Sequence, residues 1–204
     1  FLMIWPEAKY GGMGDSDFRY EQIIFEETGR AGCKGWFNTL HSRLVGTYFK
    51  RFGTEEQRER FLPKCVSGDT ILAIAMTEPG AGSDLAGMRT TAEDKGDHFL
   101  LKGSKTYISN GINSDVVIVA AKVAGAEKKH AMVLLIVERG MEGFERGRNL
   151  KKMGMPAQDT AELFFNDVKV PKANVLGEAG KGFYYLMEGL AEERLISAVG
   201  SIAN

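Results

Sequence analysis

Residues 75–85 read AMTEPGAGSDL, and in this stretch an apolar run stops at a proline and two closely spaced glycines. The run that leads into it, Ile71–Met76, is apolar and short for a helix, so it predicts a buried strand. Pro79, Gly80 and Gly82 prevent that strand from continuing. The stretch therefore predicts a strand that leads into a loop made largely of backbone.

This loop has the chemistry of an anion site. Its glycines have no Cβ, so backbone N–H groups come close to a ligand, and the hydroxyls of Thr77 and Ser83 add donors. A phosphate or a flavin-type ligand suits such a loop. Taken alone, an ordinary glycine-rich turn explains the residues equally well, because short glycine motifs occur often by chance.

Composition excludes several classes of protein. The chain has 204 residues, 44% of them hydrophobic, and a formal net charge of −1. Such a chain buries a substantial core, and its charge argues against nucleic acid or an anionic membrane as the main partner. The longest apolar runs, Val116–Ala121 and Ala131–Val137, have the length of strands, so we expect no membrane span.

The cysteines and the chain ends bear on location and completeness. Cys33 and Cys65 are too few for a disulfide framework, which indicates a bacterial cytoplasm or, in a eukaryote, the mitochondrial matrix. No signal or transit segment is visible. The chain opens on Phe1 rather than Met and closes within an apparent helix at Asn204, so we expect it to be part of a longer polypeptide.

Helical patterns occupy the first third of the chain. A helix begins near Phe18, and a glycine-rich break follows at Thr28–Gly35. Apolar residues at helical spacing predict a second helix over Trp36–Phe52. Thr54 is a suitable N-cap for a third helix, which we expect Pro63 to end.

From residue 71 the pattern changes to short strands separated by turns, and the helical pattern returns at Lys181. Short strands joined by turns predict an antiparallel barrel or sandwich. The fold class is therefore α+β, with a helical domain at residues 1–70, a β domain at 71–177 and the start of a second helical domain at 178–204. The predicted strands are Ile71–Met76, His98–Leu101, Lys105–Ser109, Val116–Lys122, Ala131–Val137 and Ala161–Phe165.

A second strand end carries an aromatic ring, a hydroxyl and then a turn, in residues 107–111, YISNG. Because side chains alternate along a strand, Tyr107 and Ser109 share one face, which could meet a flat ring. For so short a segment, an ordinary surface face of a strand is the simpler interpretation.

The last helix places one carboxylate beside its apolar stripe. At about 100° per residue, Glu193 lies roughly 60° from Leu190, whereas Glu188 and Glu192 lie roughly 160° away, where a solvated carboxylate belongs. A glutamate on a helix is most often a surface or salt-bridged group. Apolar surroundings raise the proton affinity of a carboxylate, however, and a general base near neutral pH needs this property.

Other kinds of site are not indicated. The histidines His41, His98 and His130 show no metal-ligand spacing with the cysteines or with one another, so we predict no metal site. The chain also lacks a GxSxG or Cys/His nucleophile arrangement, and it lacks the GxGxxG strand-turn-helix fingerprint of dinucleotide-binding folds.

Several blocks of the sequence, taken in order, resemble the acyl-CoA dehydrogenases, most closely their long-chain and isovaleryl branches. The resemblance implies an N-terminal helical domain, a middle antiparallel β-barrel domain and a C-terminal helical bundle, of which this chain would hold part of the first, all of the second and the first helix of the third. The blocks are WPEAKYGGMG at 5–14, AMTEPGAGSDL at 75–85, GSKTYISNG at 103–111, KMGMPAQDTAELFFNDVKVP at 152–171 and GLAEERL at 189–195.

The resemblance implies FAD as the cofactor. Thr77 and Ser109 would hydrogen-bond the isoalloxazine edge, and Ser83 would meet the pyrophosphate and the thioester substrate. Family members commonly have Trp and Thr where this chain has Tyr107 and Ser109, which keep the aromatic face and the hydroxyl. The implied cofactor-binding residues are Ile74, Ala75, Met76, Thr77, Glu78, Pro79, Gly80, Ala81, Gly82, Ser83, Tyr107, Ile108 and Ser109.

The resemblance also implies Glu193 as the catalytic base, because in these branches the catalytic glutamate immediately precedes a helix arginine, here Arg194. It would remove the α-proton of an acyl-CoA while the β-hydride passes to flavin, which gives a trans-2-enoyl-CoA. Many members have Asp where this chain has Ala191, so a polar contact to substrate is absent there. The implied substrate-binding residues are Ser83, His130, Ala131, Tyr184, Ala191, Glu192, Glu193 and Arg194.

The implied partners are an electron-transfer flavoprotein, which would take the electrons, and further copies of the chain in a homodimer or homotetramer. Two other functions remain open at this point. One is a flavin-dependent acyl-CoA oxidase or monooxygenase on the same fold, and the other is a non-catalytic CoA-binding protein.

Overall fold

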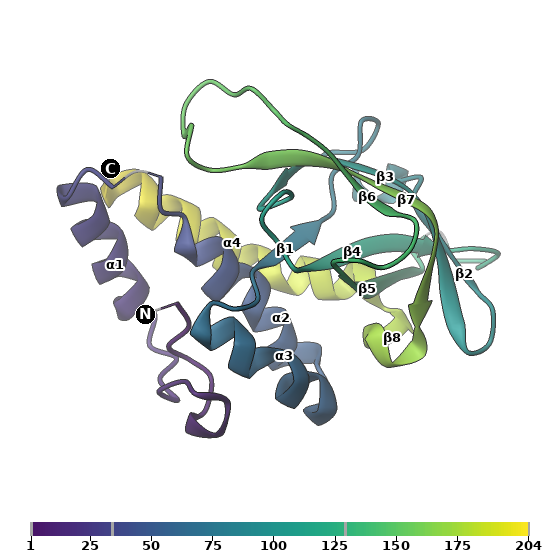
Figure 1. The fold of residues 1–204 in the computed structure, drawn as a ribbon, viewed down its shortest axis with the longest axis horizontal. Helices are drawn as coiled ribbons and strands as arrows, with labels where there is room; N and C mark the ends of the chain where they lie inside the picture. Colours follow the sequence, from purple (N-terminus) through teal and green to yellow (C-terminus); the bar gives the residue numbers. More distant parts are fainter. Residues whose placement is uncertain (1, 34, 129, 204) are drawn as a thin grey trace.

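The computed structural model describes residues 2–33, 35–128 and 130–203. It has an α+β fold in which helices come first, a mixed sheet follows and one long helix comes last (Figure 1). Phe1 and Asn204, the two ends on which we based an expectation, lie outside the described residues. The helices are α1 (Arg19–Arg30), the π-helix η2 (Leu40–Val45), α2 (Gly46–Phe52), α3 (Glu55–Ser67) and α4 (Gly182–Ala203), with short 3-10 helices η1 (Ala8–Tyr10), η3 (Leu85–Gly87) and η4 (Lys172–Asn174).

The first two helical predictions hold with changes at their ends. α1 follows Phe18 and continues to Arg30, so the predicted break begins later than Thr28. The second helix contains one widened turn, because the amide of Gly46 donates to the carbonyl oxygen of His41, five residues back. A Cβ at Gly46 would lie 2.6 Å from Cε of Met3, so a larger residue would displace the end of this side chain where the turn meets the N-terminal segment.

The prediction that Pro63 ends the third helix is wrong. α3 begins with a capping box between Thr54 and Gln57 and continues past Pro63 to Ser67, where Gly68 adopts the left-handed conformation. A proline lacks only its own N–H, and the carbonyl left without that donor belongs to Glu59, an exposed residue that water can serve. Burial of apolar residues of α3, among them Leu62, holds the helix together across the proline.

The strands are more numerous than predicted, and some of their bounds differ. The two predicted strands at 98–101 and 105–109 form one strand, and the strand predicted to end at Phe165 continues to Pro171. Three strands escaped prediction because they are polar or rich in glycine: TAED, FERGRN and VLGEAG. The strands are β1 (Leu72–Ala75), β2 (Thr91–Asp94), β3 (His98–Ser109), β4 (Val116–Val123), β5 (Met132–Glu138), β6 (Phe144–Asn149), β7 (Thr160–Pro171) and β8 (Val175–Gly180).

The sheet is mixed, which corrects the expectation of a purely antiparallel domain. Its order is β6-β7-β3-β2-β4-β5-β8, and β1 pairs with β4 beside this path. The pairs β1–β4 and β2–β4 are parallel, whereas the other ladders are antiparallel. Parallel neighbours need a crossover, and the loop after β1 together with β2 and β3 supplies the one between β1 and β4.

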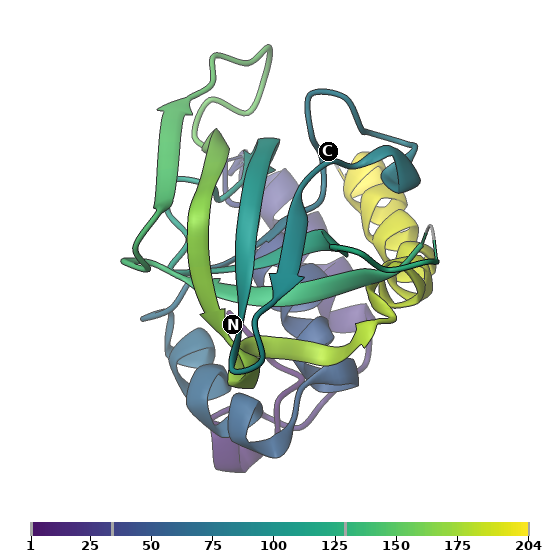
Figure 2. The same ribbon diagram turned by 90° about the vertical axis from the view of Figure 1, so that its right-hand side faces the viewer.

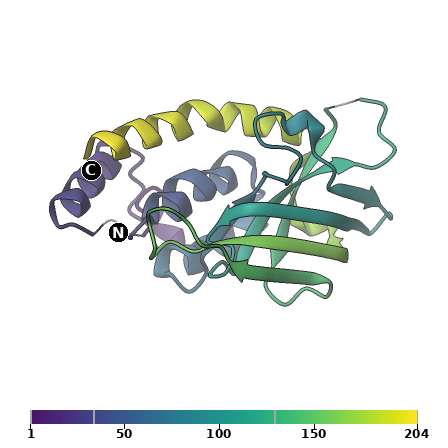
Figure 3. The same cartoon turned by 90° about the horizontal axis from the view of Figure 1, so that it is seen from above.

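Two hydrophobic clusters hold the fold, and β4 and β5 contribute to both. Val117 and Val119 of β4 face a cluster enclosed by the curled sheet, while Val116 and Ile118 face a cluster that also contains the buried side chains of α2 and α3. The apolar runs in β4 and β5 are continuous because both faces of these strands are buried. Figure 2 shows the strands in crossing layers, and Figure 3 shows α4 along one side of the molecule, from the sheet to α1.

Candidate active site

The glycine-rich loop after β1 is fastened to the sheet by a buried ion pair. Nζ of Lys105 on β3 lies 2.9 Å from Oε1 of Glu78 and 2.9 Å from the carbonyl oxygen of Met76, and none of the Lys105 side chain is exposed. The amides of Arg89 and Thr90 donate to the same carboxylate. Burial opposes the charge of Glu78, but these donors outweigh it, so the pKa of Glu78 lies below its ordinary value.

The loop is also joined to the irregular part of β3. The amide of Thr106 donates to the carbonyl oxygen of Thr77 at 2.9 Å, and Nδ2 of Asn110 donates to the carbonyl oxygen of Leu72 at 3.0 Å. The structure thus brings the two stretches singled out in the sequence, 75–85 and 107–111, side by side.

Between these anchors β3 contains a bulge that displays an aromatic ring. The ladder with β7 shifts register between Lys105 and Ile108, and Tyr107 adopts φ 58°. An aromatic residue with positive φ carries backbone strain, which persists only where the surroundings impose it. The Tyr107 side chain is 69% exposed while Ile108 is buried, so the bulge turns the ring outward. Ser109 is half-buried.

The predicted cofactor-binding residues divide into two groups. The first group consists of exposed or half-buried residues. It includes Gly80 and Gly82, where an added Cβ would meet nothing within 4 Å, so the backbone of the loop faces open space. The outward group is Met76, Thr77, Pro79, Gly80, Gly82, Ser83, Tyr107 and Ser109. The side chains of the other group are buried, so only their backbone is available to a ligand: Ile74, Ala75, Glu78, Ala81 and Ile108.

A carboxylate on α4 occupies a half-buried position against α2. The hydroxyl of Tyr48 donates to Oε1 of Glu193 over 3.3 Å, and Tyr48 is buried. Burial raises the pKa of Glu193, and it outweighs the opposing effects of Tyr48, Arg51 and Arg194. A carboxylate with raised proton affinity next to an apolar surface can accept a proton from a weakly acidic carbon.

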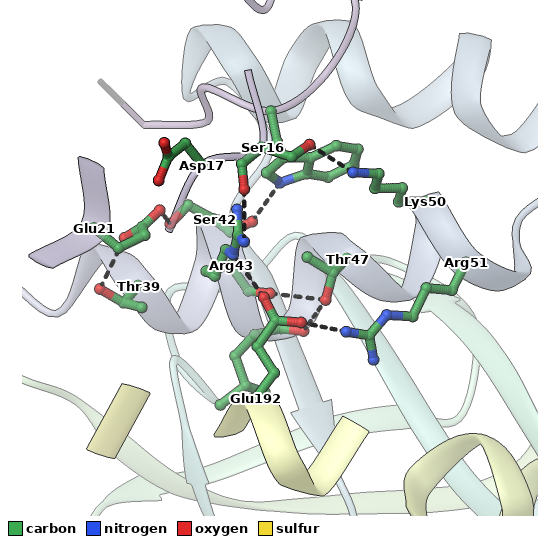
Figure 4. A network of polar contacts seen from close by, with 12 residues as sticks. Ser16, Asp17, Glu21, Thr39, Ser42, Arg43, Thr47, Lys50, Arg51 and Glu192 are labelled. Carbon is green, nitrogen blue, oxygen red and sulfur yellow. Dashed lines mark hydrogen bonds and ion pairs between the residues drawn. The ribbon is translucent and has the colours of Figure 1, made fainter. Parts of the chain in front are cut away.

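Glu192 corrects the helical-wheel expectation. It was expected on the solvent side of the last helix, but its carboxylate binds two arginines of the preceding helices, Nε of Arg43 at 2.6 Å and the guanidinium of Arg51 (Figure 4). The buried residues of α4 are Gly182, Leu186, Gly189 and Ile196. These positions and Glu193 lie within roughly 40° of one line along the helix, so the packed stripe is centred on Glu193 rather than on Leu190.

The loop and α4 approach each other in space. Figures 2 and 3 both draw η3, the short helix within the loop, beside α4. Leu85 of η3 and Phe183 of α4 pack against the same hydrophobic cluster. The loop and the helix that carries Glu193 are therefore neighbours, although about 100 residues separate them in the sequence.

The residues predicted to contact CoA gather at the start of α4. The ring of His130 lies 4.7 Å from that of Phe183, and Met132 forms a bridge to Lys181 next to the helix. His130 and Tyr184 are exposed, and Ala131 is half-buried. Two further predicted residues, Ala191 and Arg194, are exposed farther along α4.

Sequence reasoning missed three residues of this arrangement: Tyr48, Lys105 and Phe183. Tyr48 lies within the helix predicted over Trp36–Phe52, and its hydroxyl gave no sign of a partner more than a hundred residues away. Lys105 lies between Ser104 and Thr106, two polar neighbours that give no sign that its side chain is buried. Phe183 directly precedes the predicted Tyr184, but the sequence does not show that its ring lies beside His130.

Two negative expectations concern the described residues. Within residues 2–33, 35–128 and 130–203, no group of three or more His, Cys, Asp or Glu side chains is arranged to hold a metal ion. In that same part of the chain, no helix has both the length and the apolar character to cross a membrane.

Two family models match the chain. Residues 1–69 match the acyl-CoA dehydrogenase N-terminal domain, and residues 73–168 match the acyl-CoA dehydrogenase middle domain. Among curated proteins, the mitochondrial long-chain specific acyl-CoA dehydrogenase of Mus musculus is 51% identical over 193 residues, covering 93% of this chain and 44% of that protein. The mitochondrial isovaleryl-CoA dehydrogenase of Pongo abelii is 44% identical, covering 98% of this chain and 48% of that protein.

Solved structures give the same picture. An acyl-CoA dehydrogenase from Geobacillus kaustophilus superposes with a TM-score of 0.95 at 52% identity, covering all of this chain and 54% of that one. An acyl-CoA dehydrogenase from Bacillus anthracis, complexed with FAD, superposes with a TM-score of 0.90 at 35% identity, covering 99% of this chain and 35% of that one. The chain thus spans about half the length of the curated relatives it matches.

Proposed function

Because the chain belongs to the acyl-CoA dehydrogenase family, we propose that it carries the flavin-binding wall and the catalytic base of an enzyme that converts an acyl-CoA thioester to a trans-2-enoyl-CoA. The observation that supports this most is the position of Glu193, a half-buried carboxylate of raised pKa on a helix beside the glycine-rich loop. A surface glutamate would have neither property.

The residues of the loop and the bulge fit FAD, the cofactor of this family. The backbone at Gly80 and Gly82 is open to a phosphate, and Thr77 and Ser109 offer hydrogen-bonding groups beside the outward ring of Tyr107. Bound FAD would supply the oxidising power of the reaction by accepting a hydride from the β-carbon. The Glu78–Lys105 pair keeps the loop in place without using its outward groups.

Glu193 would take the α-proton of the thioester. Its half-buried position makes the neutral acid more favourable than it is in water, so a proton gained from carbon is retained. The hydrogen bond from Tyr48 limits the directions in which the carboxylate can point. Together these two features give a base that is both oriented and able to hold a proton.

The remaining contacts would bind the CoA portion and the thioester. His130, Ala131 and Tyr184 gather at the start of α4, and Ser83 is exposed on the loop. Ala191 and Arg194 lie on the exposed side of α4, near the base. We further propose an electron-transfer flavoprotein as the electron acceptor and a homodimer or homotetramer as the assembled form. The proposed location is a bacterial cytoplasm or, in a eukaryote, the mitochondrial matrix.

The test uses the full-length protein with FAD and a panel of acyl-CoAs of graded length and branching. We expect anaerobic bleaching of the flavin absorbance, and Glu193→Gln should retain the bound flavin while the rate of bleaching falls by about 10²–10⁴-fold. Oxygen consumption that outpaces reduction of an artificial acceptor would indicate an oxidase or monooxygenase instead. Ligand binding without any turnover would indicate a CoA-binding protein.

A further inference from the structure

The carboxylate of Glu192 joins α4 to the preceding helices through both of its oxygens. Nε of Arg43 lies 2.6 Å from Oε1, and the guanidinium of Arg51 binds Oε2. The exposed fractions of the three side chains are 12% for Arg43, 25% for Arg51 and 22% for Glu192. Charge-assisted hydrogen bonds in such a partly enclosed site are stronger and less screened by salt than those of an exposed pair.

The π-helical turn brings the two arginines to one side. Arg43 and Arg51 are eight residues apart, which in a regular α-helix separates side chains by about 80° around the axis. The widened turn of η2 contains more residues per turn, so it reduces that angle and lets both guanidinium groups reach the same carboxylate. Figure 4 shows both arginines pointing toward Glu192.

The rotation of α4 decides where the neighbouring Glu193 points. Glu193 is about 100° around the helix from Glu192. Close contact occurs at Gly189, where an added Cβ would lie 3.0 Å from the hydroxyl oxygen of Tyr48 and 3.0 Å from Oε1 of Glu193. With the helices this close, a small rotation of α4 would change the distance between Tyr48 and Glu193.

We propose that Glu192 is a positioning residue: held by Arg43 and Arg51, it fixes the rotation of α4 and so directs Glu193 toward the substrate. This proposal rests on the proposed function, in which Glu193 is the base. It differs from the sequence expectation for Glu192, because both oxygens of this carboxylate bind arginines of the preceding helices. Arg43 is further fixed by a hydrogen bond from its guanidinium to the carbonyl oxygen of Ser16 at 3.0 Å.

The experiment compares Glu192→Gln with Glu188→Gln in the full-length flavoprotein. Glu188 lies one turn earlier on α4 and is exposed, so it is a matched control on the same helix. For each variant, three quantities are measured: the dissociation constant of an acyl-CoA, kcat at saturation, and the rate at which the α-hydrogens of the thioester exchange with D2O. The exchange depends on the base and not on completed oxidation, so it reports Glu193 directly.

We expect Glu192→Gln to lower both kcat and exchange by about tenfold or more, while the dissociation constant changes by less than about twofold. Arg51→Gln should behave in the same way, and the double variant should be little worse than either single one. Glu188→Gln should match the wild type. The acid limb of the kcat/KM profile should also move to lower pH, because the charge of Glu192 raises the pKa of Glu193 and is lost in this variant. The groups that lower this pKa, Tyr48, Arg51 and Arg194, remain.

Two outcomes would overturn the proposal. A larger dissociation constant with unchanged kcat would assign Glu192 to substrate binding. Unchanged values of all three quantities would show that the ion pairs of Glu192 with Arg43 and Arg51 have no effect on Glu193. If Glu192→Gln does not fold, Arg51→Lys serves instead, since it keeps the charge but loses the planar geometry. Failure of the proposed function is recognised separately, because Glu193→Gln would then retain the wild-type rate.

Discussion

The hydroxyl of Tyr48 donates a hydrogen bond to the carboxylate of Glu193 across 145 positions of sequence. The bond joins α2 to α4 at the point where Gly189 allows the two helices to approach closely. It stabilises the ionised carboxylate, whereas burial of Glu193 favours the neutral acid. The protonation of the proposed base therefore depends on a residue of another helix.

Tyr48→Phe should raise the pKa of Glu193 further, because it removes a hydrogen-bond donor and keeps the apolar ring. Since the base must be ionised to act, the acid limb of the kcat/KM profile should move to higher pH. Tyr10→Phe is the control, as it removes a hydroxyl that bonds Glu55 at 2.7 Å instead. An acid limb that stays in place in Tyr48→Phe would contradict the role given to this hydroxyl.

Lys105→Met should destabilise the fold by about 3–5 kcal/mol, because it leaves the carboxylate of Glu78 buried without its cation. The double variant Glu78→Gln/Lys105→Met should recover part of this loss. Lys102→Met provides the comparison, since its ammonium lies 3.6 Å from Asp167 in an exposed pair worth less than about 1 kcal/mol. Equal losses for the two single variants, measured by denaturant unfolding, would show that Lys105 is not a special anchor.

Tyr107→Gly should separate stability from cofactor binding. Glycine adopts positive φ without strain, and the exposed ring contributes little packing, so the free energy of unfolding should stay level or rise by up to about 1 kcal/mol. Affinity for FAD should fall, because the ring is lost. Asp167→Gly, at φ 53°, relieves strain on a different strand and should leave FAD affinity unchanged. Wild-type affinity in Tyr107→Gly would remove the ring from the cofactor site.

His41 should make the fold less stable below about pH 6.5. Its ring contacts the carbonyl oxygen of Cys65 at 3.0 Å through Nε2 and accepts from the amide of Leu72 at 3.1 Å, so one neutral tautomer satisfies both partners. Burial lowers the pKa of His41. As the pH falls, His41 binds a proton in the unfolded chain before it does so in the folded chain, so the free energy of unfolding decreases. Unfolding free energies at about pH 7.5 and about pH 5.5 should differ, and His41→Gln should reduce that difference.

The sequence predicted the elements that carry a strong apolar signal. The strands at 116–122 and 131–137 were predicted because both faces are apolar, and the position of Glu193 beside apolar surface was predicted because it lies near apolar neighbours. The polar strand β6 and the glycine-containing β8 escaped prediction because, as the two ends of the sheet order, they need less apolar surface.

The rotation of α4 could not be predicted for a different physical reason. Its packed stripe includes two glycines, Gly182 and Gly189, which mark close approach of backbones but carry no hydropathy signal. A helical wheel centred on Leu190 is therefore rotated by roughly 60° from the packed stripe, and this error placed Glu192 on the solvent side. The arginines that bind Glu192 are nearly 150 residues away in sequence, so no local pattern connects them.

β4 and β5 supply alternate side chains to both hydrophobic clusters, so the same two strands form part of the core under the helices and part of the core inside the sheet. If one cluster is exposed to water, these two strands lose packing on one face, and the other cluster is weakened as well. The segments that match two separate family models should therefore unfold in a single cooperative transition. Heat or denaturant that loosens the helices would at the same time release the glycine-rich loop.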